Sequence, residues 1–311
     1  MKSWVIGLTL CLAAQATWAV TPFVLSDAAA SEDTDRNRVQ SVTLGAGLYT
    51  DPDKSLFNRV GYRHAFYRFT APGFALRGNA DLLFASRSWD TSRGELRTEG
   101  EVGQIRLDNG RSHAIGFGQV VGRINPQVGY EVRLERHIVD SPASLQSGIV
   151  YNALTAAADY EVTPRFVLSG VLGQINFSDD NRRPMARAKA TYVISEEHGF
   201  SGYVRGRYYR DSNPYTGNYF SPERFGEVLG GVGIRRRVGE IKGTLSAFAE
   251  YGRQRIDGSG SPVYGWQVRY ESFVHQMWRL ELALGAQSTA GTLGGSGYRY
   301  RYGRVSLLIP F

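Results

Sequence analysis

The sequence predicts an all-β fold, a transmembrane antiparallel up-and-down β-barrel, on the evidence of three features. Many segments of about ten residues alternate apolar and polar side chains, which is the pattern of a strand with two different faces. After residue 19, no apolar run approaches the roughly 20 residues that a membrane-spanning helix needs. The chain ends in four apolar residues at alternate positions, Val305, Leu307, Ile309 and Phe311. Together these features favour strands that cross a bilayer.

The first nineteen residues predict a secretory signal peptide. A single lysine precedes the apolar run of residues 4–14, and the small residues Ala16 and Ala19 follow it as candidate cleavage points. Cys11 is the only cysteine of the chain and lies inside this run, after Leu10 rather than after the small residue of a lipoprotein signal. A mature chain that lacks residues 1–19 would have no disulfide, thiolate metal site or cysteine nucleophile.

Residues 20–37 are expected to form a short periplasmic segment ahead of a barrel that comprises residues 38–311. Acidic side chains lie among small polar residues here, which is typical of a flexible segment. These acidic residues are Asp27, Glu32, Asp33 and Asp35.

Alternation alone does not show which face of the expected strands points inward. The two-residue period is clearest in residues 128–135, 200–208, 264–271 and 278–285. In a soluble barrel the apolar face would fill the interior. The terminal aromatic residue, the Tyr and Trp residues near strand ends, and a polar face rich in Arg and Glu favour the membrane orientation, with apolar side chains facing lipid.

Fifteen segments within residues 40–311 have the pattern of strands. From the C-terminus back to the turn at residues 163–164, connections alternate between short and long, with a long one at residues 252–262. The short turn at residues 70–73 is out of phase with this series, so we expect one further strand within residues 84–146. With both termini on the periplasmic side the number of strands is even; sixteen is our prediction and fourteen the alternative.

A barrel of this size encloses more space than side chains fill, so an aqueous lumen is expected. The outward placement of the apolar face puts the following charged residues on the lumen side: Arg133, Arg187, Lys189, Arg205, Arg207, Arg235, Lys242, Arg269 and Arg279, with Glu131, Glu135, Glu227, Glu250, Glu271 and Glu281. Lys and Arg (36) outnumber Asp and Glu (29) in the whole chain, so a passing anion would meet a favourable field.

Part of this lumen face is a candidate substrate path. Aromatic rings stack on the C–H faces of sugars, and forked Arg donors suit carboxylates and hydroxyls. The candidate residues are Tyr203, Arg205, Arg207, Tyr209, Arg269, Arg279, Tyr298, Tyr300 and Tyr302. The alternative is that the arginines pair with glutamates on neighbouring strands and that the tyrosines fill space along the wall.

The last strand also carries a candidate assembly signal. Outer-membrane barrels end in the pattern polar, x, glycine, x, x, apolar, x, aromatic, which the barrel-assembly machinery recognises. Arg304, Ser306, Ile309 and Phe311 fit this pattern, with serine in the place of glycine. Further expected partners are outer-membrane lipid and lipopolysaccharide, whose phosphates the outward-facing Arg299 and Arg301 could meet.

Three stretches resemble the barrel domains of bacterial exopolysaccharide-export outer-membrane proteins of the cellulose and poly-N-acetylglucosamine types. The first has Arg136, Asp140 and Ser141, the second Asp179, Asn181 and Arg182, and the third Tyr219, Phe220, Ser221 and Pro222. The resemblance is densest over residues 131–252, and it implies a sixteen-stranded pore through which a glycan leaves the cell. Those exporters carry periplasmic tetratricopeptide repeats, in whose place this chain has about twenty residues. The resemblance therefore implies a separate periplasmic scaffold, or none, and a polysaccharide synthase as partner.

Each of the three stretches also has a purely structural interpretation. Residues 178–184 suit a loop, with Asx turns and a proline. Residues 219–222 suit an aromatic girdle followed by a proline that opens a strand.

No catalytic, metal or cofactor site is expected. The five histidines are scattered without metal-binding spacing, and no Gly-x-Ser-x-Gly elbow occurs. Gly230, Gly231 and Gly233 lie inside a strand pattern, which excludes a nucleotide-binding loop, and no basic run suggests nucleic acid. The alternatives to polysaccharide export are a general or substrate-selective diffusion porin, a closed structural or adhesion barrel, and a barrel hydrolase of lipid.

Overall fold

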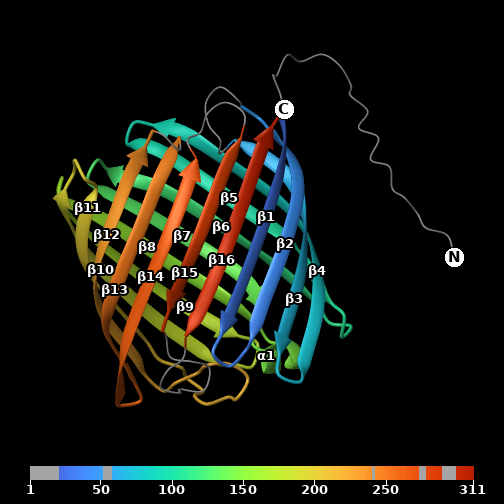
Figure 1. Ribbon diagram of the computed structural model, residues 1–311. Helices are drawn as coiled ribbons and strands as arrows, with labels where there is room; N and C mark the ends of the chain where they lie inside the picture. Colours follow the sequence, from blue (N-terminus) through green and yellow to red (C-terminus); the bar gives the residue numbers. More distant parts are fainter. Residues whose placement is uncertain (1–20, 52–57, 240–241, 273–277, 289–298) are drawn as a thin grey trace, which may run out of the picture.

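The computed structural model describes residues 21–51, 58–239, 242–272, 278–288 and 299–311. They form a closed antiparallel barrel in which every strand pairs with its neighbours in sequence and β1 closes on β16 (Figure 1). The strands are β1 Thr21–Asp33, β2 Arg38–Tyr49, β3 Arg59–Ala71, β4 Phe74–Thr91, β5 Gly94–Leu107, β6 Ser112–Asn125, β7 Val128–Ile138, β8 Val150–Thr163, β9 Phe166–Phe177, β10 Arg182–Ser195, β11 Phe200–Tyr209, β12 Phe225–Val238, β13 Gly243–Ile256, β14 Ser259–Ser272, β15 Arg279–Gln287 and β16 Tyr300–Pro310. A helix, α1, spans Pro142–Ser147. The predicted all-β barrel of sixteen strands is confirmed.

The sixteenth strand lies where the sequence analysis expected a flexible segment. Thr21–Asp33 is β1, which pairs with β16 on one side and β2 on the other. The expected periplasmic segment of residues 20–37 and the barrel boundary at residue 38 are therefore wrong, as is the extra strand expected within residues 84–146. The expected signal of residues 1–19 lies outside the described residues.

The two rims of the barrel differ, because one holds both ends of the described chain and the other holds α1. Thr21 and Phe311 lie together at the terminal rim, where the Phe311 amide donates to the Pro22 carbonyl over 2.9 Å. The opposite, distal rim carries α1 (Figure 1). The chain reverses at each strand, so the short turn between β3 and β4 lies at the distal rim, and short turns occur on both rims.

The connection expected to be long at residues 252–262 is a two-residue turn. Strands β13 and β14 continue to Ile256 and from Ser259, and Asp257 (φ 49°) and Gly258 (φ 92°) join them. Two positive φ angles suit the right-handed twist of a hairpin, and Asp-Gly adopts them readily. Lys242, which was expected in the lumen, also lies in a turn, between β12 and β13.

The outer face of the barrel is apolar, as predicted. Trp266 and Trp278 are 44% and 49% exposed, and Leu134 and Leu172 also point outward. Inward residues alternate with these, and most of the charged side chains on the predicted lumen face are there. No helix among the described residues is long and apolar enough to cross a membrane.

Candidate functional site

Arg205 joins three adjacent strands on the inner wall. It lies on β11, and its guanidinium contacts Glu227 of β12 at 2.9 Å and Glu250 of β13 at 2.7 Å. The Tyr203 hydroxyl donates to Glu250 over 3.0 Å. The side chains of Glu227 and Glu250 are only 1% and 6% exposed, so Arg205 neutralises two carboxylates that water scarcely reaches.

Arg207 and Tyr209 continue this wall toward the distal rim. Arg207 pairs with Glu227 at 3.2 Å, and its guanidinium lies 4.7 Å from the centre of the Phe225 ring. Tyr209 stacks on the same ring with centroids 4.6 Å apart. The positive charge of Arg207 is thus shared between a carboxylate and an aromatic face.

The remaining described residues of the predicted path lie on β14, β15 and β16. Arg269 pairs with Glu281 at 3.1 Å, and Arg279 pairs with Glu271. The rings of Tyr300 and Tyr302 lie 5.8 Å apart, and the Tyr302 hydroxyl accepts a hydrogen bond from the Gln267 amide. Tyr298 is outside the described residues. The path arginines are therefore engaged in the wall, which agrees with the bracing interpretation for each of them.

Strands β3, β5 and β7 carry a second set of inward ion pairs; the sequence analysis placed Arg133 and Glu135 in the lumen but did not single out Arg63 and Glu101. Arg63 pairs with Glu101, and Arg133 pairs with Glu135 at 2.8 Å. The Tyr151 hydroxyl donates to Glu135 over 2.5 Å. The same two-residue period that placed Arg133 inward also places Arg63 and Glu101, so the signal was present in the sequence.

Two inward cations on β10 have no carboxylate partner in the part of the chain that the structure describes. They are Arg187 and Lys189, which pair in the backbone register with Arg207 and Arg205. The Lys189 ammonium lies 4.2 Å from the centre of the Tyr203 ring. Arg187 and Lys189 thus add positive charge to the lumen that no described carboxylate within contact distance balances, on β10 rather than on the predicted path.

The connection between β7 and β8 folds into the barrel. It contains α1, whose Leu145 is 2% exposed and belongs to an apolar cluster with Phe69, Ile105 and Leu107 on the inner faces of β3 and β5. The Asn109 side-chain amide donates to the Leu145 carbonyl over 3.3 Å. This α1 connection occupies part of the lumen at the distal rim.

The connection between β11 and β12, residues 210–224, meets the α1 connection. Ser141 caps the N-terminus of α1 by accepting from the Ser144 amide. The hydroxyls of Ser141 and Ser144 both donate to the Asn218 carbonyl, Ser144 over 2.9 Å. Contacts from residues more than 70 positions apart thus join the two connections across the distal mouth.

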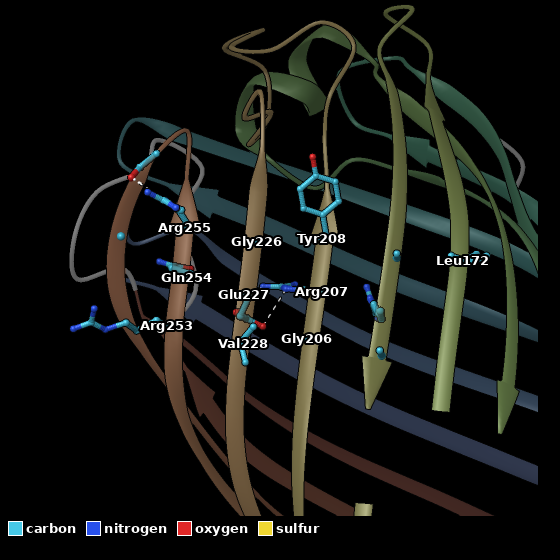
Figure 2. Close-up of a pocket in the computed structure, with 15 residues that line it drawn as sticks. Leu172, Gly206, Arg207, Tyr208, Gly226, Glu227, Val228, Arg253, Gln254 and Arg255 are labelled. Atoms are coloured by element: carbon cyan, nitrogen blue, oxygen red, sulfur yellow. Dashed lines mark hydrogen bonds and ion pairs between the residues drawn. The ribbon is translucent and has the colours of Figure 1, made fainter. Parts of the chain in front are cut away.

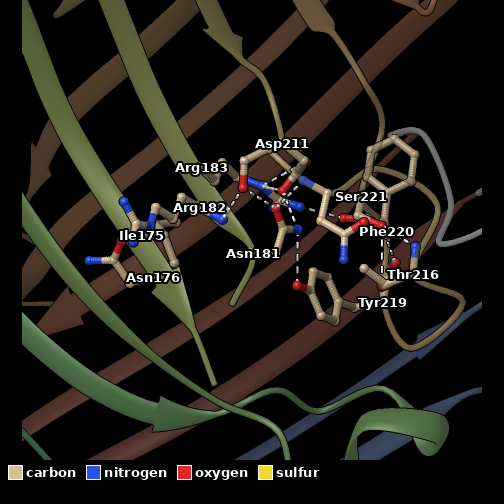
Figure 3. Close-up of polar contacts among 12 residues, drawn as sticks. Ile175, Asn176, Asn181, Arg182, Arg183, Asp211, Thr216, Tyr219, Phe220 and Ser221 are labelled. Atoms are coloured by element: carbon tan, nitrogen blue, oxygen red, sulfur yellow. Dashed lines mark hydrogen bonds and ion pairs between the residues drawn. The ribbon is translucent and has the colours of Figure 1, made fainter. Parts of the chain in front are cut away.

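Asn181 is the centre of a polar cluster at this rim (Figure 3). Its side chain is fully buried, and its amide donates to Asp211 over 2.9 Å and to the Tyr219 hydroxyl over 3.0 Å. Its carbonyl oxygen accepts from the Asn213 amide. Tyr219 donates in turn to Asp179, and burial raises the pKa of Tyr219, so its hydroxyl remains a donor.

Arg183, rather than the predicted Arg182, supplies the charge of this cluster. Arg183 contacts both oxygens of Asp211 at 2.9 and 3.1 Å and donates to the Phe220 carbonyl. Its guanidinium also lies 4.7 Å from the Tyr209 ring centre. The Arg182 side chain is exposed, and only its backbone takes part: its amide donates to the Ser212 hydroxyl and its carbonyl accepts from the Ser212 amide.

Most residues of the three motif stretches meet at the distal rim. Tyr219 stacks on Phe177 with ring centroids 4.3 Å apart, Ser221 is buried and Pro222 is fully buried. Arg136 differs, because it faces outward on β7 and donates to Asn152. We call the contacts of residues 141–145, 177–183 and 210–222 the rim cluster. Asp140 adjoins it in the α1 connection.

The predicted assembly signal divides between the two faces of β16. Arg304 contacts Asp27 of β1 at 2.7 Å, and the Ser306 hydroxyl donates to the same carboxylate. Ile309 and Phe311 point outward, and Phe311 is 70% exposed. The polar half therefore helps to close the barrel, and the apolar half is free for a partner.

No group of His, Cys, Asp and Glu in the described residues could hold a metal ion. The inner wall presents charged and aromatic side chains to the lumen.

Comparisons with known proteins show a similar fold among solved structures. No family model matches the chain. No curated protein matches it either. Among solved structures, a bacterial polysaccharide outer membrane secretin matches with a TM-score of 0.71 and 11% identity over 96% of this chain and 100% of that one. Pseudomonas aeruginosa OccK3 (OpdO) matches with a TM-score of 0.47 and 10% identity over 94% of this chain and 96% of that one. Pseudomonas aeruginosa OccK7 (OpdD) matches with a TM-score of 0.45 and 9% identity, over 94% and 98%. At these identities, what is shared with the secretin is the sixteen-stranded barrel fold.

Proposed function

We propose that this barrel is an outer-membrane channel through which an extracellular polysaccharide leaves the cell. The proposal rests on the two different faces of the sixteen-stranded wall. Tryptophans and aliphatic residues lie on its outer face, and paired charges lie on its inner face. A barrel of this size holds water. The fold shared with a polysaccharide secretin supports the choice of a polymer as cargo.

The chemistry of the inner wall suits a sugar polymer. The Arg205 side chain is 29% exposed toward the lumen, and Glu250, which is only 6% exposed, compensates its charge from within the wall. Such a surface exchanges hydrogen bonds with hydroxyls without holding any one sugar tightly, as conduction requires. The free cations Arg187 and Lys189 favour a glycan that carries some acidic groups, as they attract an anion electrostatically.

The same proposal includes the partners expected from the sequence. The outward Ile309 and Phe311 are available to the barrel-assembly machinery. A polysaccharide synthase and, where the system has one, a periplasmic scaffold are the further partners that we propose.

Deletion of the gene in its own host tests the proposal. We expect surface polysaccharide to disappear, to return with the complementing gene, and small-sugar uptake to stay normal. Normal surface polysaccharide in the deletion strain would refute the export channel.

A diffusion porin is the second candidate, and the inward α1 connection favours it, because a loop folded into the lumen narrows a pore to the size of small solutes. Swelling of vesicles that contain the purified barrel distinguishes the two. Fast entry of mono- and disaccharides, together with an unchanged polysaccharide coat in the deletion strain, would favour the porin.

A further inference from the structure

The outer face of the barrel has a hollow that is separate from the lumen. Its volume is about 950 Å³, within the range of roughly 300–1,000 Å³ seen for ligand sites. Residues of β9 to β14 line it, most of them outward, and Figure 2 shows them on the neighbouring strands. We call it the outer groove.

Two rows of side chains form the outer groove, because the strand registers align them. In the first row, Leu172, Ala186, Tyr208, Gly226 and Arg255 lie side by side on β9 to β13. The second row lies two residues farther from the distal rim along each strand and consists of Ala188, Gly206, Val228 and Arg253 on β10 to β13. Small residues make the floor, and Leu172, Tyr208 and Val228 stand above it.

Neither backbone conformation nor crowding requires glycine at these positions of the groove. A Cβ atom added to Gly226 would meet no atom within 4 Å, one added to Gly206 would make ordinary contacts at 3.4 Å or more, and neither residue has a left-handed φ angle. The missing side chains therefore create space for something outside the protein. Apolar walls and a position on the lipid-facing surface suit acyl chains.

The arginines at the edge of the outer groove add a requirement for negative charge. Arg253 and Arg255 are exposed and point outward from β13, about 7 Å apart along the strand. Neither forms an ion pair in the described part of the chain, and Arg255 only donates to the Gly258 carbonyl. Two unpaired cations beside an apolar hollow match a lipid whose acyl chains adjoin phosphate groups.

The rest of the distal rim has the same charge. Exposed arginines occur there on β3, on β4 and just after β11, namely Arg68, Arg77 and Arg210, and Arg68 faces Arg77 directly in the strand register. Acids occur there too: Glu32 pairs with Arg38, Glu223 pairs with Arg224, and Asp257 accepts hydrogen bonds from the Tyr215 hydroxyl and the Arg224 amide. A leaflet rich in phosphate would relieve the repulsion between these arginines.

We propose that the outer groove binds the phosphorylated glycolipid anchor of lipopolysaccharide, with acyl chains against Ala188 and Gly206 and phosphates on Arg253 and Arg255. The proposal concerns the lipid-facing surface and does not depend on what passes through the lumen. It makes one lipid molecule a bound component of the barrel beside β9 to β13.

Titration of the purified full-length barrel in nonionic detergent with bisphosphorylated lipid A tests this site. We expect Arg253→Ala with Arg255→Ala to weaken binding about thirtyfold, from about 1 kcal/mol for each cation. Gly226→Leu with Ala188→Leu fills the groove and should weaken binding comparably, while both cations remain. Arg236→Ala, outward on β12 near the terminal rim, is the matched control and should bind as the parent protein does.

Heat-modifiable migration on gels confirms that each variant is folded. Dephosphorylated lipid A should bind as weakly as the bisphosphorylated lipid binds to the arginine variant. Equal binding of both lipids, or binding of phosphatidylglycerol as tight as that of lipid A, would overturn the proposal, as would unchanged affinity in either double variant.

Discussion

Arg205 contacts two buried glutamates on the inner wall, and its loss would leave Glu250 without its ion-pair partner and Glu227 with Arg207 alone. We expect Arg205→Ala to lower the free energy of unfolding by about 3 kcal/mol, because an uncompensated buried charge is costly. Arg187→Ala is the control, since Arg187 also faces the lumen but has no carboxylate partner among the described residues. Urea unfolding of the two variants in lipid vesicles measures the difference, and equal midpoints would show that the Arg205 network contributes no stability.

Asn181 has a similar position in the rim cluster, where it connects Asp211, Tyr219 and the backbone of residue 213. Asn181→Ala leaves these buried groups unsatisfied, so residues 210–224 should open more often. We expect trypsin to cleave after Arg210 or Arg224 about tenfold faster, from a loss of about 1.4 kcal/mol. Asn176→Ala is the control because Asn176 is exposed; the same cleavage rate in both variants would contradict the assignment.

At the scale of elements, the short helix α1 packs against the inner faces of β3 and β5 and so occupies part of the lumen. Leu145→Asp places a carboxylate in the apolar cluster with Phe69 and Leu107, where it has no partner, so the α1 connection should leave the lumen. We expect a higher single-channel conductance in planar bilayers. Gln146→Asp introduces the same charge at an exposed position of α1 and should leave conductance unchanged. Equal conductance in folded Leu145→Asp would mean that α1 does not restrict the passage.

A variant of the last strand can distinguish the folding of the barrel from its recognition by the assembly machinery. Phe311 is mostly exposed and contributes one backbone hydrogen bond to Pro22, so the barrel closes largely without it. We expect deletion of Phe311 to reduce the amount of barrel in the outer membrane of cells while refolding into detergent proceeds normally. Phe311→Tyr keeps an aromatic terminus and should insert normally. Full insertion of the truncated chain would remove the assembly signal.

The alternation of side chains predicted the strands well because it depends only on neighbours along the chain. It placed Arg133, Arg205 and Arg269 inward and Trp266 outward, as the structure has them. Strand β1 was missed because its alanines and acids resemble a disordered segment; its strand structure comes from pairing with β2 and β16, and Asp27 finds its partner, Arg304, at the other end of the chain.

The rim cluster could not be predicted as a cluster. Its stretches were identified in sequence, but the contact of Asn181 with Tyr219 spans 38 positions and that of Ser144 with Asn218 spans 74. No local pattern encodes such pairs. The turn at Asp257 and Gly258 could have been predicted from the sequence. Asp-Gly between two alternating segments is a local signal for a two-residue hairpin turn, and the expectation of a long connection overlooked it.

For the molecule as a whole, the account depends on the inner wall facing water and on the cargo passing along it. Cys11 is the only cysteine and lies in the expected signal peptide, so an introduced cysteine would be unique in the mature chain. Lys189 faces the lumen, and Val204 faces outward from β11, next to β10.

Labelling of living cells with a bulky, membrane-impermeant maleimide tests both points in one measurement. The account predicts that Lys189→Cys is labelled and that polysaccharide release then falls, whereas Val204→Cys is shielded by lipid and release continues. Labelling of Val204→Cys without labelling of Lys189→Cys, or complete labelling of Lys189→Cys with undiminished release, would contradict it.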